Sequence, residues 1–320
     1  MRGMREFVEP RDRPVLLALR ALKLGDLLVA VPAIHGLRRA FPEHELVLAV
    51  PGWLRPIADL VGGVDALLPT PGLDAPLPVA PGVVDIAVNL HGRGPESRGL
   101  IDALEPRRRI AHRSPSHPEG PEWVDGVLER WRWARLVAAH GVAADEDDVA
   151  IAVPADRAVA PGAAVLHVGA FYGSRRWPVE RFAAVARGLR ADGLEIEITG
   201  DEADVARARA VAELAGLPDE AVLAGGLGLA DLAAEIAAAR VLVSADTGAA
   251  HLASAYGTPS VVIFGPAPVE EWGPPPGPHV ALTDADVRRG DVFADEPDPA
   301  LLAVTADDAL AAARSLLASP

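Results

Sequence analysis

The stretch 241-VLVSADTGAAHLASAYGTPSVVIF-264 contains two short apolar runs separated by small and polar residues. Val241 to Ala245 and Ser260 to Phe264 are rich in β-branched residues and show no helical period, so both predict β-strands. The residues between them, Ala249 to Tyr256, predict one compact helix that ends at Gly257. A strand, a helix and a second strand in this order indicate an α/β fold with parallel strands.

The start of the predicted helix is a candidate anion site. Asp246 and Thr247 are favoured N-cap residues, and Gly248 lets a ligand or a backbone segment come close. A helix that starts at the carboxyl end of a parallel strand presents free N–H groups and a partial positive charge, which favour a phosphate. On a simpler interpretation, Asp246 and Thr247 cap the helix and His251 is an interior histidine. The clustering of S-x-D-T-G-x-x-H, A-x-G-x-P and F-G-P-x-P within one short span favours the functional interpretation.

The length and charge of the chain limit its class. With 320 residues the chain is long enough for two domains that each bury a core. A net charge of −15 argues against a general binder of nucleic acid or of anionic membranes. The absence of cysteine excludes disulfides and cysteine-ligated metals. The same absence fits a cytoplasmic location. The sequence has no apolar run of about 18 residues, so we expect no membrane span.

Asp26 is the candidate residue of the first half. Val15 to Leu19 predicts a strand, and Leu27 to Ala40 predicts a helix after a tight turn. The residues alone leave two interpretations of Asp26 equally open. It is either a first-turn carboxylate that caps the helix or a side chain that projects from the carboxyl end of a strand into a ligand cleft. Lys23, the lone lysine, is a candidate phosphate contact, although a solvated turn residue is the simpler expectation.

Two further features of the first half are weak candidates for acceptor binding. His91 and Arg93 lie in a glycine-flanked loop after the predicted strand Val83 to Asn89, where a loop could form an acceptor-side wall. Arg107 and Arg109 belong to the dense basic patch of the chain. A solvated face is the default for such a patch, and an acceptor that carries phosphate or carboxylate is the alternative.

Further elements follow from the same patterns. The patterns predict further strands at Glu45 to Val50, Val64 to Leu68 and Ala221 to Ala224. Glu122 to His140 predicts a helix that contains Trp123.

The second half repeats the order of strand, ligand loop and helix. Ala163 to Val168 predicts a strand, and a glycine-bearing loop with Arg175 and Arg176 leads into a helix that starts with proline. The next predicted strand, Leu194 to Thr199, leads to Glu202. Glu202 is either a first-turn helix carboxylate or a ligand-binding group.

Four motifs, in this order, resemble those of glycosyltransferase family 9, the heptosyltransferase-like enzymes of the GT-B fold. They are the G-D motif at Asp26, the basic residues before the Trp-Pro pair, the G-D-E at Glu202, and the S-x-D-T-G-x-x-H segment. The resemblance covers nearly the whole chain, from Val15 to Leu317. It implies two Rossmann-like, doubly wound domains that face each other across a cleft, with Asp26 as the general base.

The resemblance also implies roles for the matching residues of the second half. Arg175 would contact the donor diphosphate, with Arg176 as its neighbour and competitor. This chain has arginine where relatives carry lysine, which keeps the charge and changes the geometry. Glu202 would hold the ribose hydroxyls, Asp246 would orient donor-sugar hydroxyls or cap its helix, and His251 would buttress Asp246.

The implied activity is a metal-independent, inverting transfer of a heptose-like sugar from a nucleotide-diphosphate donor, ADP-linked by preference. The acceptor would be a hydroxyl of a glycan, glycolipid or natural product, in lipopolysaccharide or other envelope glycan synthesis. Arg175 and the N–H groups at Thr247 to Ala249 would stabilise the leaving diphosphate. The expected protein is a monomer without a cofactor, with peripheral contact at the inner membrane face allowed. The alternatives are a GT-B transferase or epimerase that uses a UDP- or GDP-sugar, and a non-catalytic protein that binds sugar nucleotides or glycans.

The predicted organisation has four parts. We expect a disordered leader over residues 1–13, an acceptor-side Rossmann-like domain over 14–155, a nucleotide-sugar-binding Rossmann-like domain over 156–304, and a closing helix over 305–320. The segment 284–299 shows no periodic pattern that assigns it an element.

Overall fold

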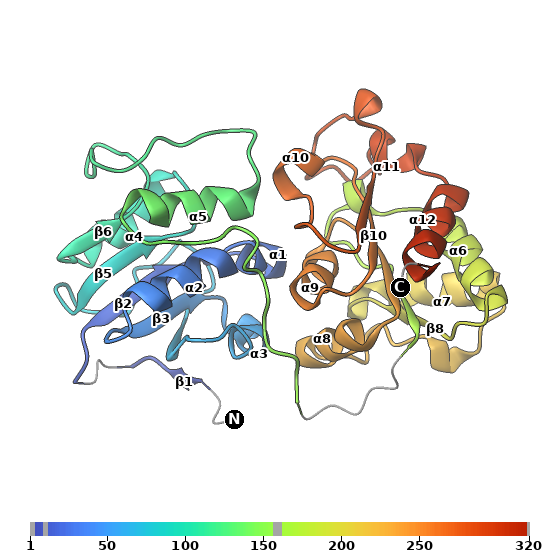
Figure 1. Cartoon of the computed structure of the whole chain (residues 1–320), viewed down its shortest axis with the longest axis horizontal. Helices are drawn as coiled ribbons and strands as arrows, with labels where there is room; N and C mark the ends of the chain where they lie inside the picture. The colour runs from blue at the N-terminus through green and yellow to red at the C-terminus, as the bar shows by residue number, and fades with distance from the viewer. Residues whose placement is uncertain (1–3, 9–11, 156–161, 319–320) are drawn as a thin grey trace. The chain divides into compact units, whose positions relative to one another are not determined.

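The computed structural model describes residues 4–8, 12–155 and 162–318. The chain divides into two compact units, Met1–Ala152 and Val153–Pro320 (Figure 1). Each unit is built on its own parallel sheet with flanking helices, so the predicted α/β architecture is present in both.

The sheet of the first unit has the strand order β1-β4-β3-β2-β5-β6, and all neighbouring pairs run parallel. Its strands are β1 (Arg5–Glu6), β2 (Val15–Leu19), β3 (Glu45–Val50), β4 (Ala66–Pro69), β5 (Val84–Asn89) and β6 (Arg108–Ile110). Its helices are α1 (Leu24–Leu28), α2 (Val31–Ala40), α3 (Arg55–Ala58), α4 (Pro95–Ala103) and α5 (Glu129–Ala139). Strands β2 and β3 are buried along their whole length, as expected for parallel strands covered on both faces.

The sheet of the second unit has the order β11-β10-β9-β7-β8, again with parallel neighbours. Its strands are β7 (Ala164–His167), β8 (Ile196–Thr199), β9 (Val241–Ala245), β10 (Ser260–Ile263) and β11 (His279–Leu282). Its helices are α6 (Val179–Ala191), α7 (Val205–Ala215), α8 (Leu229–Ala238), α9 (Gly248–Tyr256), α10 (Val269–Trp272), α11 (Pro299–Ala303) and α12 (Ala306–Ala318). The bounds of β2 and β9 are those predicted from the sequence, and the closing helix is confirmed as α12.

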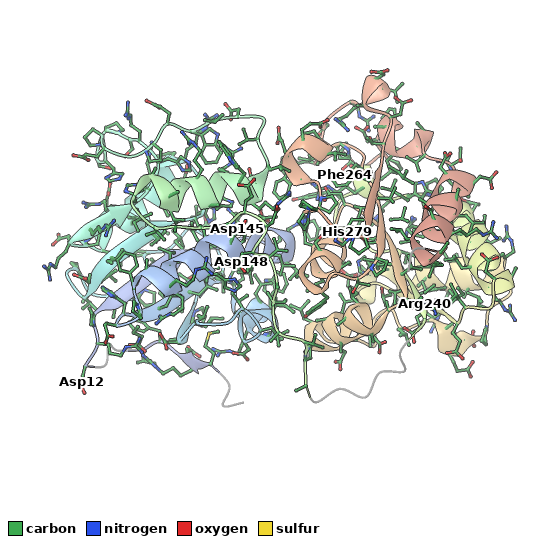
Figure 2. All side chains as sticks on the ribbon, in the orientation of Figure 1. Asp12, Asp145, Asp148, Arg240, Phe264 and His279 are labelled. Carbon is green, nitrogen blue, oxygen red and sulfur yellow. The ribbon has the colours of Figure 1, made fainter. Side chains whose placement is uncertain are left out.

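The core of the second unit forms where helices cover its sheet. Trp177 and Phe182 are fully buried, and their rings meet edge to face with centroids 4.9 Å apart. The Trp177 indole N–H donates to the carbonyl of Val304 at 3.1 Å, which ties the start of α6 to the segment before α12. At the β11 edge, the Nδ1 atom of His279, labelled in Figure 2, lies 2.8 Å from the hydroxyl of Ser260 on β10.

The start of the chain differs from the predicted leader. Arg5 and Glu6 form β1, which pairs with β4 through Ala66 and Leu67. Phe7 is buried in the core of the first unit, because it is an apolar ring placed directly after the strand. Residues 1–3 and 9–11 of the predicted leader lie outside the described residues.

Two predicted elements are wrong. The predicted strand Ala221 to Ala224 is replaced by a 3-10 turn at Asp219–Ala221 and a single bridge between Ile198 and Val222. Helix α5 begins at Glu129, so Trp123 lies in the loop before it. Gly126 in that loop has a φ of +67°, a conformation that an α-helix does not contain.

Candidate functional site

The start of α9 leaves its first N–H groups without a side-chain cap. Thr247 occupies the N-cap position with an extended backbone, but its hydroxyl lies 3.0 Å from the hydroxyl of Ser244 and does not bond to the helix. The first N–H groups of an α-helix have no acceptor within the helix. The N–H groups near Gly248 are therefore oriented to bind an anion at the carboxyl end of β9.

Asp246 lies beside this helix start, between two groups that can carry positive charge. Its side chain is almost fully buried, with Oδ2 3.7 Å from Arg175 Nη2 and Oδ1 3.8 Å from His251 Nε2. Arg175 Nη1 also donates to the Asp246 carbonyl at 3.4 Å. Among the described residues, Asp246 Oδ2 has no hydrogen-bond partner. These distances exceed the roughly 2.7–2.9 Å of a tight charged hydrogen bond, so Asp246 does not hold the Arg175 guanidinium in a close two-pronged pair.

The loop that carries Arg175 and Arg176 is fixed from the other side by the segment before α11. The Ser174 N–H donates to the carbonyl of Ala294 at 2.8 Å, and the Ser174 hydroxyl donates to the carbonyl of Val292 at 2.9 Å. Arg175 is partly exposed, whereas Arg176 is exposed and donates from Nε to the carbonyl of Ala170 at 3.3 Å. Arg175 is thus the arginine that the structure brings to Asp246 and the start of α9.

Glu202 follows the carboxyl end of β8. The cap at this turn is Asp201, whose Oδ1 accepts from the Ala203 N–H at 2.8 Å, and Glu202 is exposed. A Cβ on Gly225, which has a φ of +76°, would lie 3.0 Å from Glu202 Oε2. Glu202 is thus a first-turn carboxylate, as its simpler interpretation expected, while the capping bond comes from Asp201.

Three further polar residues near this edge of the sheet are not evident from the sequence. Nδ1 of His167, at the end of β7, lies 3.0 Å from the Thr199 hydroxyl, and burial lowers the pKa of His167 to about 4. Burial raises the pKa of Asp204, with the neighbouring Asp201 charge adding to the effect. Arg207 donates from Nε to the carbonyl of Val168 at 3.0 Å. For His167, the sequence did contain a signal of a candidate site residue, namely a polar residue at the end of an apolar strand.

Asp26 lies in the first turn of α1, which follows β2, and makes the contact that the capping interpretation predicts. Its Oδ2 accepts from the Lys23 N–H at 3.3 Å, as a helix cap does, and its Oδ1 accepts from Arg20 Nη2 at 3.3 Å. Arg20 also donates from Nε to the Asp26 carbonyl at 2.8 Å. The Asp26 side chain is 24% exposed, so it is held in place and remains accessible.

Arg20, which sequence reasoning missed, organises this site. It is 1% exposed, its guanidinium lies 4.6 Å from the ring centroid of Trp133, and it donates to the Leu90 carbonyl. Burial lowers the pKa of Arg20, and the nearby Asp26 opposes that effect. Burial and the Arg20 charge lower the pKa of His91 to about 4, so His91 is neutral at neutral pH.

Among the other candidates of the first unit, Lys23 contacts Asp26 through its backbone, and three arginines pair with other carboxylates. Lys23 is exposed and contributes its backbone N–H. Arg93 pairs with a carboxylate of the loop before α5, and Arg107 and Arg109 pair with carboxylates of β5 and α4. Arg107 precedes β6 and so lies at the amino edge of the sheet, whereas Asp26 follows the carboxyl end of β2. The three arginines have the contacts expected of a solvated face.

Within residues 4–8, 12–155 and 162–318, no group of three or more His, Asp or Glu side chains is arranged to hold a metal ion. In the same part of the chain, no helix is long and apolar enough to cross a bilayer.

The second unit has a helix start without a side-chain cap, an arginine loop and a carboxylate at the carboxyl ends of parallel strands. This arrangement is typical of nucleotide-binding α/β domains. Residues 138–284 match the model of glycosyltransferase family 9 (heptosyltransferase). The resemblance to this family, predicted from the four motifs, is confirmed.

Relatives and solved structures agree with this result. Over 147 residues the chain is 29% identical to lipopolysaccharide heptosyltransferase 3 of Escherichia coli, a match that covers 45% of this chain and 43% of the relative. The chain therefore spans less than half the length of this curated relative.

Two solved structures show the fold. A family 9 glycosyltransferase from Veillonella parvula has a TM-score of 0.74 at 18% identity, over 96% of this chain and 97% of that one. An E. coli heptosyltransferase with ADP has a TM-score of 0.70 at 18% identity, over 94% and 99%. The predicted fold class, α/β with Rossmann-like domains as in these GT-B enzymes, is confirmed.

Proposed function

We propose that the protein is a glycosyltransferase that moves a heptose-like sugar from an ADP-linked donor to a hydroxyl of a glycan or glycolipid acceptor. The observation that carries this proposal is the start of α9, where the Thr247 hydroxyl bonds to Ser244 and Arg175 lies against Asp246. The match to the heptosyltransferase family over residues 138–284 includes these residues. A similar structure was solved with ADP, which supports ADP as the nucleotide.

The donor diphosphate would be bound by charge and by backbone N–H groups, without a metal. The N–H groups at the start of α9 and the Arg175 guanidinium would take the negative charge that grows on the leaving diphosphate. Glu202 would accept hydrogen bonds from the ribose hydroxyls, a role that carboxylates have in doubly wound folds. Asp246, with Oδ2 lacking a hydrogen-bond partner among the described residues, would orient the donor sugar, and His251 would support it.

Asp26 would act as the general base. Its carboxylate would take the proton of the acceptor hydroxyl, whose oxygen attacks the anomeric carbon as the bond to the diphosphate breaks and ADP leaves. A single displacement of this kind inverts the anomeric centre. Since Arg20 and the Lys23 N–H hold the Asp26 carboxylate, its orientation is set before a substrate binds.

The proposal extends to the acceptor, the location and the oligomeric state. The match to a lipopolysaccharide heptosyltransferase supports an acceptor in envelope glycan synthesis and a cytoplasmic, peripheral location. We also propose that the protein is a monomer.

Calorimetric titration with ADP, UDP and GDP, each with and without Mg²⁺, tests the donor site. We expect ADP to bind most tightly and its affinity to be indifferent to Mg²⁺. Asp26→Asn should keep that affinity and lower kcat by about 10²- to 10⁴-fold, the usual effect of removing a general base. Tighter binding of UDP or GDP would mean that the donor is a UDP- or GDP-sugar. If none of the three nucleotides bound, the proposed transferase function would be refuted. Full activity of Asp26→Asn would refute the role of Asp26 as general base.

A further inference from the structure

Three aromatic side chains of the second unit form a row that the proposed reaction does not use. Phe171 and Phe293 are 74% and 69% exposed. Tyr172 meets Phe171 edge to face at 4.8 Å between centroids and Phe293 edge to face at 5.2 Å. An aromatic ring that stays largely exposed on a soluble protein is uncommon, and a group of them is typical of a binding surface.

The row rests on a rigid support. Gly173 follows Tyr172, and a Cβ there would lie 1.6 Å from the carbonyl oxygen of Asp295, so the two backbones are in contact. The Ser174 carbonyl accepts from the N–H of Asp298, whose fully buried carboxylate accepts from the N–H groups of Gly290 and Ala300. The segment that carries Phe293 is therefore held at both ends, and its ring loses little conformational freedom when a ligand binds.

The sheet order places the two segments that carry this row beside the strand that leads to the proposed diphosphate site. Arg175 follows the row on the same loop, and Arg288 donates from Nε to the carbonyl of Gly265, beyond the end of β10, at 2.9 Å. The row thus connects the loop after β7 with a segment held at the β10 side, and β7 and β10 are the two neighbours of β9 in the sheet. If the diphosphate binds at the start of α9, which follows β9, a sugar attached to it would lie at the same end of the sheet as the aromatic row.

We propose that Phe171 and Phe293 form an aromatic platform that stacks against the C–H face of a sugar ring. The proposal rests on the proposed function, because it takes the position of the nucleotide from it. A sugar ring presents axial C–H groups on one face and hydroxyls at its rim, so an exposed phenyl ring covers the apolar face while the hydroxyls stay in water. The ring belongs either to the transferred sugar of the donor or to a sugar of the acceptor.

Binding measurements on Phe171→Ala, Phe293→Ala and the double variant test the platform. The probes are ADP, the non-transferable donor analogue ADP-2-deoxy-2-fluoro-heptose, and a methyl heptoside titrated in the presence of saturating ADP. For the double variant we expect an unchanged ADP affinity and a loss of about tenfold, the effect of one stacked ring, for one of the two sugar-bearing probes. A loss for the analogue assigns the platform to the transferred sugar, and a loss for the heptoside assigns it to the acceptor.

Two control variants test whether a loss of affinity results from removal of these rings. Trp53→Ala removes a 55% exposed ring in the first unit and should change no affinity. Phe171→Tyr keeps the ring and should bind as the wild type does. Unchanged affinities for both sugar-bearing probes, or an equal loss for ADP, would overturn the platform. Failure of the wild type to bind ADP would instead overturn the proposed function.

Discussion

The interaction of Arg20 with Asp26 shows how one buried residue can define a candidate active site. Arg20 directly follows β2 and has its guanidinium over Trp133, with hydrogen bonds to the Asp26 side chain and backbone. The cost of burying the charge is offset by these partners, because an unpaired buried charge is strongly unfavourable. Arg20 would not touch the reacting atoms in this arrangement; it positions the group that does.

Substitution of Arg20 should therefore affect turnover more than donor binding. For Arg20→Gln we expect kcat to fall about 10- to 100-fold, a part of the effect of losing a general base. The KM for the donor should stay within about twofold, since the donor groups lie in the second unit. Arg20→Lys, which keeps the charge, should recover part of kcat.

The matched control is Arg130→Gln, which removes another buried arginine of the first unit, one that pairs with Asp147 at 3.1 Å. This variant should lower stability without a specific loss of kcat. Equal kcat losses in the two variants, at the same folded fraction measured by circular dichroism, would show that Arg20 acts through stability alone.

At the scale of elements, the loop after β7 depends on a partner more than a hundred residues away in the chain. Ser174 bonds to the carbonyls of Val292 and Ala294, and Gly173 lies against Asp295. The close approach needs a residue without a side chain, because a Cβ at Gly173 would overlap the Asp295 carbonyl. The segment 284–299, which has no periodic pattern in the sequence, thus has a definite structural role.

Gly173→Ala should displace the loop and with it Arg175. We expect a loss of stability of about 1–3 kcal/mol, as for other overpacked sites, and an ADP affinity lowered by about tenfold or more, since Arg175 is a charged contact. Thermal unfolding and ADP titration measure the two effects. Gly99→Ala in α4 is the control, because nothing lies within 4 Å of a Cβ there. If Gly173→Ala bound ADP as tightly as the wild type does, the position of this loop would not matter for donor binding.

At the scale of the whole molecule, stability depends on pH through two groups whose pKa values are shifted in opposite directions. Burial, together with the charge of Arg132, lowers the pKa of His112 to about 4 from its ordinary 6.5, so the unfolded chain binds a proton there that the folded chain does not. His112 therefore lowers stability as the pH falls from about 6.5 to 4. Burial and Glu235 raise the pKa of Glu197 to about 7 from 4.5, so this carboxyl lowers stability as the pH rises through 7.

Two substitutions should separate these contributions. His112→Phe should gain stability relative to the wild type progressively as the pH falls below 6.5, because phenylalanine suits the contacts with Trp123 and Trp133 and takes no proton. Glu197→Gln should become progressively more stable relative to the wild type as the pH rises from about 4.5 through 7. Urea unfolding of both variants and the wild type from pH 4 to pH 8 gives these differences. A difference that does not vary with pH would refute the corresponding assignment.

The sequence predicted the strands that carry the candidate site better than the contacts that complete it. β2 and β9 are short, fully buried and almost entirely apolar, so the absence of a helical period predicted both as strands. Asp246 follows β9 directly, and Asp26 lies in α1, after the turn that follows β2. Arg20 was missed because it continues an apolar run and gives no sign of being buried. The contact between Ser174 and Ala294 joins loops through backbone atoms, which carry no residue-type signal.

The uncapped start of α9 limits how stable this fold can become. A side chain that bonded to those N–H groups would add about 0.5–2 kcal/mol, as N-caps do elsewhere. Such a side chain would also occupy the positions that the diphosphate is proposed to use, so the same change would oppose binding. Selection for heat tolerance in this lineage would therefore have to act away from the strand-to-helix turn at Thr247, and the turn should stay weakly capped even in a thermostable homologue.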